Sequence, residues 1–221
     1  MAARPIALVN AVIAMAGGVV LVHLSRDGGG DASPPPASDL HNLSESMLVD
    51  ENAVPPLAGT SWGRIVAVPQ GSGPPVNPPE CGLFLSQGDA LQKAVAMRSS
   101  QGAAIGVELA IDDQRVDLAN LRDTCAVFTL ESPGVRSRVR LERTCLAGLA
   151  DGAISTLLHS ETTARGTFVA WEVALIAGYH RGVLVTAEYT PGPQGGQFDD
   201  KLASTLPALY DAQIKRLDAV S

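Results

Sequence analysis

The feature that most constrains this chain is a run of twenty residues near its start, Pro5 to Leu24, that contains no Asp, Glu, Lys or Arg. A helix of that length covers about 30 Å, the thickness of the hydrocarbon core of a bilayer. We therefore expect residues 1–27 to form a membrane anchor, so that the membrane is one partner of the protein. Asn10 and His23 are compatible with a span, because an amide finds a partner in or between helices and His23 lies near the interface.

Two alternatives to an uncleaved anchor stay open. The run could be a signal peptide, since Arg4 precedes it and Ala14-Met15-Ala16 matches a small-x-small cleavage site. Cleavage there would leave the apolar stretch 17–22 exposed, which favours the uncleaved anchor. The run could also belong to a soluble core, although its position directly before a linker argues against this. Arg4 precedes the run, and Arg26 and Asp27 follow it. This small difference in positive charge favours a cytoplasmic N-terminus with the rest of the chain outside.

Residues 28–38 are typical of a linker. The stretch from Arg26 to Ser38 combines three glycines with three prolines and has no apolar periodicity. The remainder, residues 39–221, is long enough to bury one substantial core. We expect it to be a single extracytoplasmic α+β domain.

Antiparallel strands are predicted to dominate this domain. From Ala103 to Ile111 apolar residues alternate with small or polar ones, the pattern of a half-buried strand. Helical spacing is predicted for residues 40–48, 116–124 and 197–219. Because strands and helices do not alternate regularly, we expect an antiparallel sheet with helices packed mainly on one face, preceded by one transmembrane helix. The expected hairpins join 93–99 to 103–111, 126–130 to 135–143 and 166–177 to 182–190, with a further strand at 152–160.

The charge balance argues against nucleic acid as a partner. The chain has 16 Lys and Arg against 23 Asp and Glu, a net charge of −7. Proteins that bind nucleic acid need a basic surface to neutralise phosphates. We therefore expect no nucleic-acid partner.

The residues also give little support to catalysis, metal binding or cofactor binding. His159, Ser160 and Glu161 are adjacent, so that they alternate between opposite faces of a strand and cannot act together. Asp112-Asp113 and Asp199-Asp200 lie next to expected helix starts, where carboxylates stabilise the helix dipole. We therefore predict no catalytic residue, metal site or cofactor, and rank a hydrolase third among the functional hypotheses.

Three aromatic residues are candidates for ligand binding. Trp171, Tyr179 and Tyr189 fall in the last expected hairpin of a chain with only 4% aromatic residues. They could line a ligand pocket against the C-terminal helix, although core packing is the more common role of such side chains.

A row of arginines is a second candidate for binding. Arg136, Arg138 and Arg140 have the same parity and therefore point to one side of their strand. They form either a small basic patch for an anionic partner or a solvated face or edge that resists aggregation.

Several segments together resemble mycobacterial exported domains, namely the PknH-like extracellular sensor domains and related lipoproteins of unknown function. The resemblance spans roughly residues 40–217. It implies a non-enzymatic extracytoplasmic α+β domain, a ligand groove in the sensor branch, and a disulfide between Cys81 and Cys125. The chain departs from these domains in having no kinase domain and no lipid-attachment cysteine. The segments that carry the resemblance are the N-terminal hydrophobic run and spacer, Pro78-Pro79-Glu80-Cys81, Asp123-Thr124-Cys125-Ala126-Val127-Phe128, and a late hairpin with Trp171 before a terminal helix.

The third cysteine, Cys145, is left without a predicted partner. If the hairpin turns at Pro133-Gly134, Cys125 faces a residue near Glu142, and Cys145 lies three positions further. That offset is about 10 Å at the rise of a strand, too long for a disulfide. Cys145 is therefore expected to be free or intermolecular.

These observations predict a membrane-anchored, sensor-like domain outside the cytoplasm that binds a small ligand or an envelope protein without catalysis. The alternative is a structural or accessory cell-envelope protein that acts through protein–protein contacts. A deep apolar cavity beside Trp171 would favour the first hypothesis, and a flat apolar patch on the outer sheet face would favour the second.

Overall fold

The structure is a computed structural model that describes residues 39–54, 62–67, 74–85, 91–99, 102–111, 115–144, 146, 149–192 and 198–220. The expected anchor at 1–27, the linker at 28–38, Cys145 and the pair Asp112-Asp113 lie outside the described residues. Within these ranges, no helix has the length and hydropathy needed to span a membrane.

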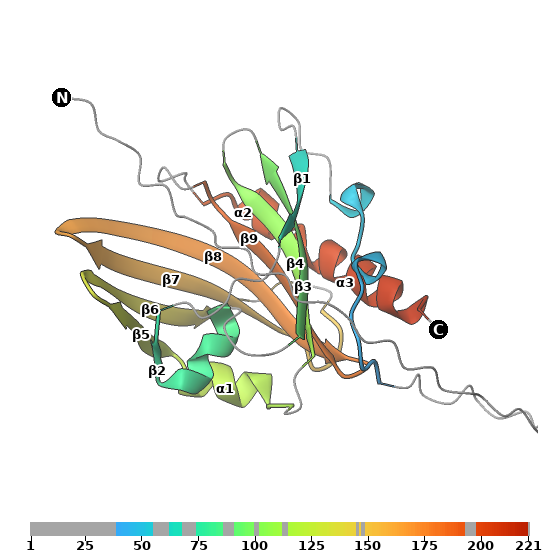
Figure 1. The fold of residues 1–221 in the computed structure, drawn as a ribbon, viewed down its shortest axis with the longest axis horizontal. Helices are drawn as coiled ribbons and strands as arrows, with labels where there is room; N and C mark the ends of the chain where they lie inside the picture. The colour runs from blue at the N-terminus through green and yellow to red at the C-terminus, as the bar shows by residue number, and fades with distance from the viewer. Residues whose placement is uncertain are drawn as a thin grey trace, which may run out of the picture.

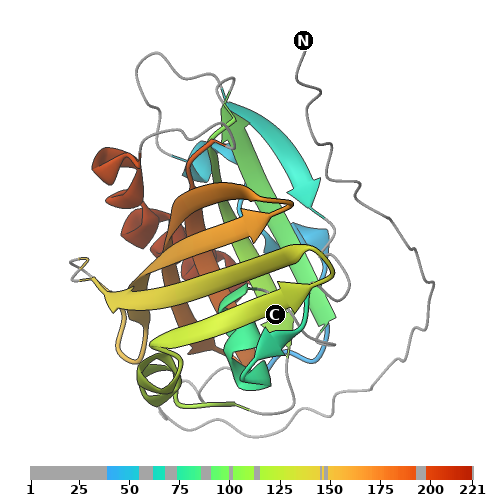
Figure 2. The same ribbon diagram turned by 90° about the vertical axis from the view of Figure 1, so that its left-hand side faces the viewer.

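The described residues form one nine-stranded sheet whose neighbouring strands all pair antiparallel. The strand order is β1-β3-β4-β9-β8-β7-β6-β5-β2. Figure 2 shows β5 to β8 side by side as a curved part of the sheet, coloured from yellow-green to orange. The strands are β1 Trp62–Ala67, β2 Val76–Asn77, β3 Leu91–Ser99, β4 Ala104–Ile111, β5 Val127–Ser132, β6 Val135–Arg143, β7 Ile154–Ala164, β8 Thr167–His180 and β9 Val183–Thr190.

The helices are short apart from the last one. They are α1 Leu118–Thr124, α2 Asp200–Ala203 and α3 Leu206–Asp218, with 3₁₀ turns η1 Glu45–Met47, η2 Glu51–Ala53 and η3 Pro79–Leu85. Asp117 caps α1, since its side chain accepts a hydrogen bond from the Asn120 N–H at 3.0 Å. Asp199 caps α2 in the same way through the Lys201 N–H at 2.8 Å, which confirms the capping role predicted for this residue.

The sheet separates two hydrophobic cores, and β8 contributes to both. Its Ala174 and Ile176 pack in the core under α2, α3 and η1, whereas Val173, Leu175 and Ala177 pack in the core under η3 and α1. We call the first side of the sheet the α3 face and the second the disulfide face. We expected helices mainly on one face, but helices cover both faces. The central strands bury both of their sides, as the continuous apolar run 173–177 requires.

The fold confirms the α+β class and the three expected hairpins, and it differs from the expectation in several further elements. Residues 40–48 form no α-helix, and 3₁₀ turns occur at η1 and η2 instead. The C-terminal helix is divided between α2 and α3, and Pro207 lies in the first turn of α3, where its missing N–H costs nothing. Strands β1 and β2 were not expected, because Trp62–Ala67 is short and Val76–Asn77 lies in a proline-rich stretch.

Candidate functional site

The β7–β8 hairpin projects from the sheet. In Figure 1 its tip lies at the end of the molecule remote from α3. The turn consists of Arg165 and Gly166, which both have positive φ, 48° and 81°, as a two-residue hairpin turn requires. The Arg165 N–H donates a hydrogen bond to the Gly134 carbonyl at 3.1 Å, so this tip is joined to the neighbouring β5–β6 turn. The projecting hairpin is therefore held in place by the rest of the sheet.

Large apolar side chains are exposed on this hairpin. Phe168 is 63% exposed, Val169 is 46% exposed and Trp171 is 37% exposed. Apart from Val127, they are the exposed large hydrophobic side chains in the part of the chain that the structure describes. Strand alternation places Phe168 on the α3 face and Val169 and Trp171 on the disulfide face. Apolar surface is thus exposed on both sides of one strand.

One edge of the same segment is open. Residues Ala174–His180 of β8 pair with β9, whereas 167–173 pair only with β7 among the described residues. Ala164 and Thr167 close the two-residue turn, so their N–H and C=O groups point toward each other. The backbone groups of Phe168, Ala170 and Glu172 consequently point to the open side.

The structure does not bring the three predicted ligand-binding aromatic residues together. Trp171 and Tyr179 lie eight residues apart on β8, about 26 Å at the rise of a strand. Tyr189 is 1% exposed and packs in the core on the α3 face. The geometry therefore does not support a single pocket lined by all three.

Both tyrosines have structural partners. The Tyr179 hydroxyl accepts a hydrogen bond from the Val116 N–H at 3.3 Å, and the Tyr189 hydroxyl accepts one from the Asp199 N–H at 3.2 Å. The Tyr189 ring lies 5.3 Å from that of Phe198. Burial raises the pKa of Tyr189, which keeps its hydroxyl neutral. These contacts attach the helices to the sheet and leave Trp171 as the one predicted aromatic residue on an exposed surface.

A small cavity lies elsewhere in the domain. Its volume is about 10 Å³, enough for one water molecule, and its lining includes Val49, Ile105 and Leu209 but none of the three aromatic residues.

The predicted arginine row lies on one exposed face, but it forms no concentrated basic patch. Arg136, Arg138 and Arg140 are all exposed on β6. Arg136 pairs with Glu131 on β5 at 3.0 Å, and Arg138 is opposite Glu161 on β7. β6 lies between β5 and β7, so the row is not at an edge of the sheet, and its exposed position agrees with the other form of the prediction, a solvated sheet face.

His159 and Ser160 point to opposite faces, as predicted. The His159 ring lies between two carboxylates, with Nε2 3.0 Å from Glu142 and Nδ1 2.7 Å from Glu172. Ser160 is buried on the disulfide face, and its hydroxyl lies 3.4 Å from that of Thr162. The described residues contain no group of three or more His, Cys, Asp or Glu side chains that could hold a metal ion.

Among the described residues, the disulfide face carries one carboxyl group with a shifted pKa. Solvent reaches the Glu188 side chain on β9, yet nearby protein atoms partly desolvate its carboxyl group, and this desolvation, with a smaller contribution from Glu108, raises its pKa to about 7. Glu188 lies opposite Gly106 on β4, one diagonal step from Glu108. The sequence alone could not predict this neighbourhood, because the two carboxyl groups are brought near each other only by the pairing register of β9 and β4.

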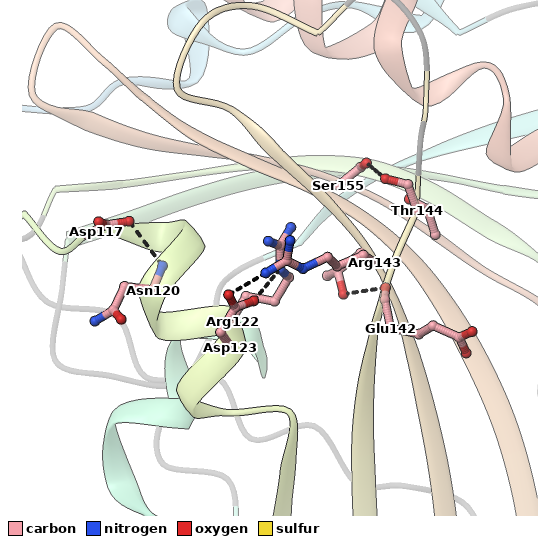
Figure 3. A network of polar contacts seen from close by, with 9 residues as sticks. Asp117, Asn120, Arg122, Asp123, Glu142, Arg143, Thr144 and Ser155 are labelled. Carbon is pink, nitrogen blue, oxygen red and sulfur yellow. Dashed lines mark hydrogen bonds and ion pairs between the residues drawn. The ribbon is translucent and has the colours of Figure 1, made fainter.

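The disulfide and an ion-pair network hold the elements of this face together. Cys81 in η3 is bonded to Cys125 at the end of α1, with a Cα–Cα distance of 5.6 Å. Figure 3 shows the Asp123 carboxylate between Arg122 of α1 and Arg143 of β6. The disulfide pairing implied by the resemblance is therefore present in the structure.

No protein-family model matches the chain, and no curated protein matches it. Its structure is similar to that of an uncharacterised protein from Mycobacterium smegmatis, with a TM-score of 0.42 and 14% sequence identity over 70% of this chain and 88% of that one.

Proposed function

We propose that this protein is a non-catalytic, membrane-anchored domain outside the cytoplasm that binds another protein through the β7–β8 hairpin. The observation that supports this proposal is the exposed, uncharged segment 167–171, which combines three large apolar side chains with an open strand edge. Monomeric proteins rarely leave such an edge uncovered.

Protein contact is favoured over small-molecule binding for a geometric reason. A ligand pocket encloses most of its ligand between converging side chains. Trp171 instead faces solvent on a projecting strand, and Tyr189 lies on the other side of the sheet. We therefore favour the second hypothesis, an accessory cell-envelope protein that acts through protein–protein contacts, over a small-molecule sensor.

Site-specific photo-cross-linking in living cells tests the proposal. A benzophenone amino acid at Phe168 is expected to give protein adducts, whereas the same group at Lys215, an exposed residue of α3, is the matched control and should give none. Equal adducts at both positions, or none at Phe168, would contradict it. Membrane fractionation, with protease added outside the cell membrane, tests the expected anchor and orientation separately.

A further inference from the structure

We infer that the protein bound by this edge is a second copy of the same chain, which pairs antiparallel with segment 167–173 of β8. The inference rests on the proposed function, because it assigns a partner to the same surface. Its support is the chemistry of the open edge and the way in which this edge complements itself.

The first five residues of the open edge lack the features that normally prevent strand pairing. Natural edge strands carry charged residues, prolines or bulges that exclude a further strand. Segment Thr167–Trp171 has the sequence TFVAW, with neither charge nor proline, and its pairing with β7 is uninterrupted. The outward N–H and C=O groups of Phe168 and Ala170 can therefore accept another strand.

The segment is complementary to itself in an antiparallel arrangement. A two-fold axis perpendicular to the sheet keeps each face on the same side, so opposite residues have the same parity. With the axis at Val169, this residue faces its own copy, Phe168 faces Ala170, and Trp171 faces Thr167. Each large aromatic side chain then lies beside a small one, and aromatic and β-branched cross-strand pairs are favourable.

Charges at the two ends of the segment also agree with this register. Glu172 of one copy lies opposite Gly166 of the other, next to Arg165. Two such contacts, related by the axis, place an acidic and a basic residue side by side and bring no like charges directly opposite each other.

A membrane surface fits the same segment less well. Phe and Trp are common at membrane interfaces, but here they lie on opposite faces of one strand. Insertion would bring the outward backbone groups of Phe168 and Ala170 into hydrocarbon without hydrogen-bond partners. A second strand satisfies these groups and covers both side chains.

Cysteine cross-linking in the full-length chain tests the inference. In membranes, and in a Cys145→Ser background, single cysteines are placed at Thr167, Val169 and Trp171 and oxidised. Oxidation is expected to give a disulfide-linked dimer that is most abundant for Val169→Cys, since opposite residues of a non-hydrogen-bonded pair are about 4.5 Å apart. Thr163→Cys, an exposed position on β7 one strand from the edge, is the matched control and should not form a dimer.

Blocking the edge provides a second readout. In the Val169→Cys chain, Ala170→Pro is expected to reduce the dimer at least tenfold, because the Ala170 N–H points to the open side and its loss breaks no bond to β7. Ala170→Lys is a second variant with the same expected result, should proline disturb folding. An intact Cys81–Cys125 disulfide and an unchanged unfolding midpoint show that each variant is folded.

The outcomes separate the two proposals. If Phe168 cross-links a different protein and none of the three cysteines gives a dimer, the inference is overturned and the proposed function stands. If the benzophenone labels only lipid, or nothing, both are overturned. A dimer unaffected by Ala170→Pro and Ala170→Lys in folded protein would also overturn the inference.

Discussion

Gln213 and Val49 are joined across 164 residues of sequence, because the Val49 N–H donates a hydrogen bond to the Gln213 Oε1 at 3.0 Å. The Nε2 of the same side chain donates to the Met47 carbonyl at 2.7 Å. Gln213 is 0% exposed, and three consecutive residues, 47–49, are buried beside it. The start of the domain is therefore attached to α3 through its backbone, which explains why residues 40–48 do not form the expected amphipathic helix.

Replacing Gln213 with leucine is expected to lower the free energy of unfolding by about 2–4 kcal/mol, because one buried N–H and one buried C=O would lose their partners. Urea denaturation measures this change. Lys215→Leu, at an exposed position on the same helix, is the control and is expected to change stability by less than about 0.5 kcal/mol. An equal effect of the two substitutions would show that the amide bridge contributes nothing specific.

The hairpins were predictable because their signals are local. Alternating apolar residues define β4, and Gly134 and Gly182, both with positive φ, lie at turns that the sequence marks with glycine. The disulfide pairing was also predictable, because the resemblance assigns Cys81 and Cys125, and the expected hairpin register argues against a Cys125–Cys145 bond.

The candidate site was less predictable, because it depends on strand order. Trp171 was singled out as an aromatic residue, but its neighbours Phe168 and Val169 were expected to be ordinary strand residues. Their exposure follows from the pairing of β9, which ends opposite Ala174 and leaves the start of β8 without a second neighbour among the described residues. No pattern within the segment itself specifies where a partner strand ends.

Gly178 illustrates the same limit and leads to a second prediction. The sequence placed it in a turn, whereas it lies inside β8, where an added Cβ would be 2.3 Å from the Tyr210 hydroxyl and 3.0 Å from the Ala153 Cβ. Gly178→Ala is therefore expected to destabilise the fold by about 1–3 kcal/mol. Thermal unfolding measures this loss. Combination with Tyr210→Phe, which removes the overlapping oxygen, should recover part of it, and strictly additive losses would contradict this explanation.

The disulfide provides a third prediction. Cys81 and Cys125 enclose 44 residues of chain, for which the loop-entropy estimate gives a stabilisation of about 4 kcal/mol. The double substitution to serine is expected to lower the free energy of unfolding by about 2–4 kcal/mol. Thiol counting under denaturing conditions should give at most one free thiol per chain before reduction, that of Cys145, and three after it. Three thiols before reduction would contradict the bond.

Glu188 leads to a prediction about pH. Desolvation, with a smaller contribution from Glu108, raises its pKa from 4.5 to about 7 in the folded protein. Between pH 4.5 and pH 7, Glu188 is protonated in the folded protein and ionised in the unfolded chain. The contribution of Glu188 to the free energy of unfolding is therefore fully present below pH 4.5 and is lost as the pH rises through 7. Glu188→Gln, which stays neutral, is therefore expected to raise the unfolding temperature at pH 8 and leave it nearly unchanged at pH 4.5. Glu51→Gln, at an exposed position on η2, controls for the loss of one negative charge from an acidic protein. An equal gain from both variants at pH 8 would mean that net charge, rather than the surroundings of Glu188, determines the effect.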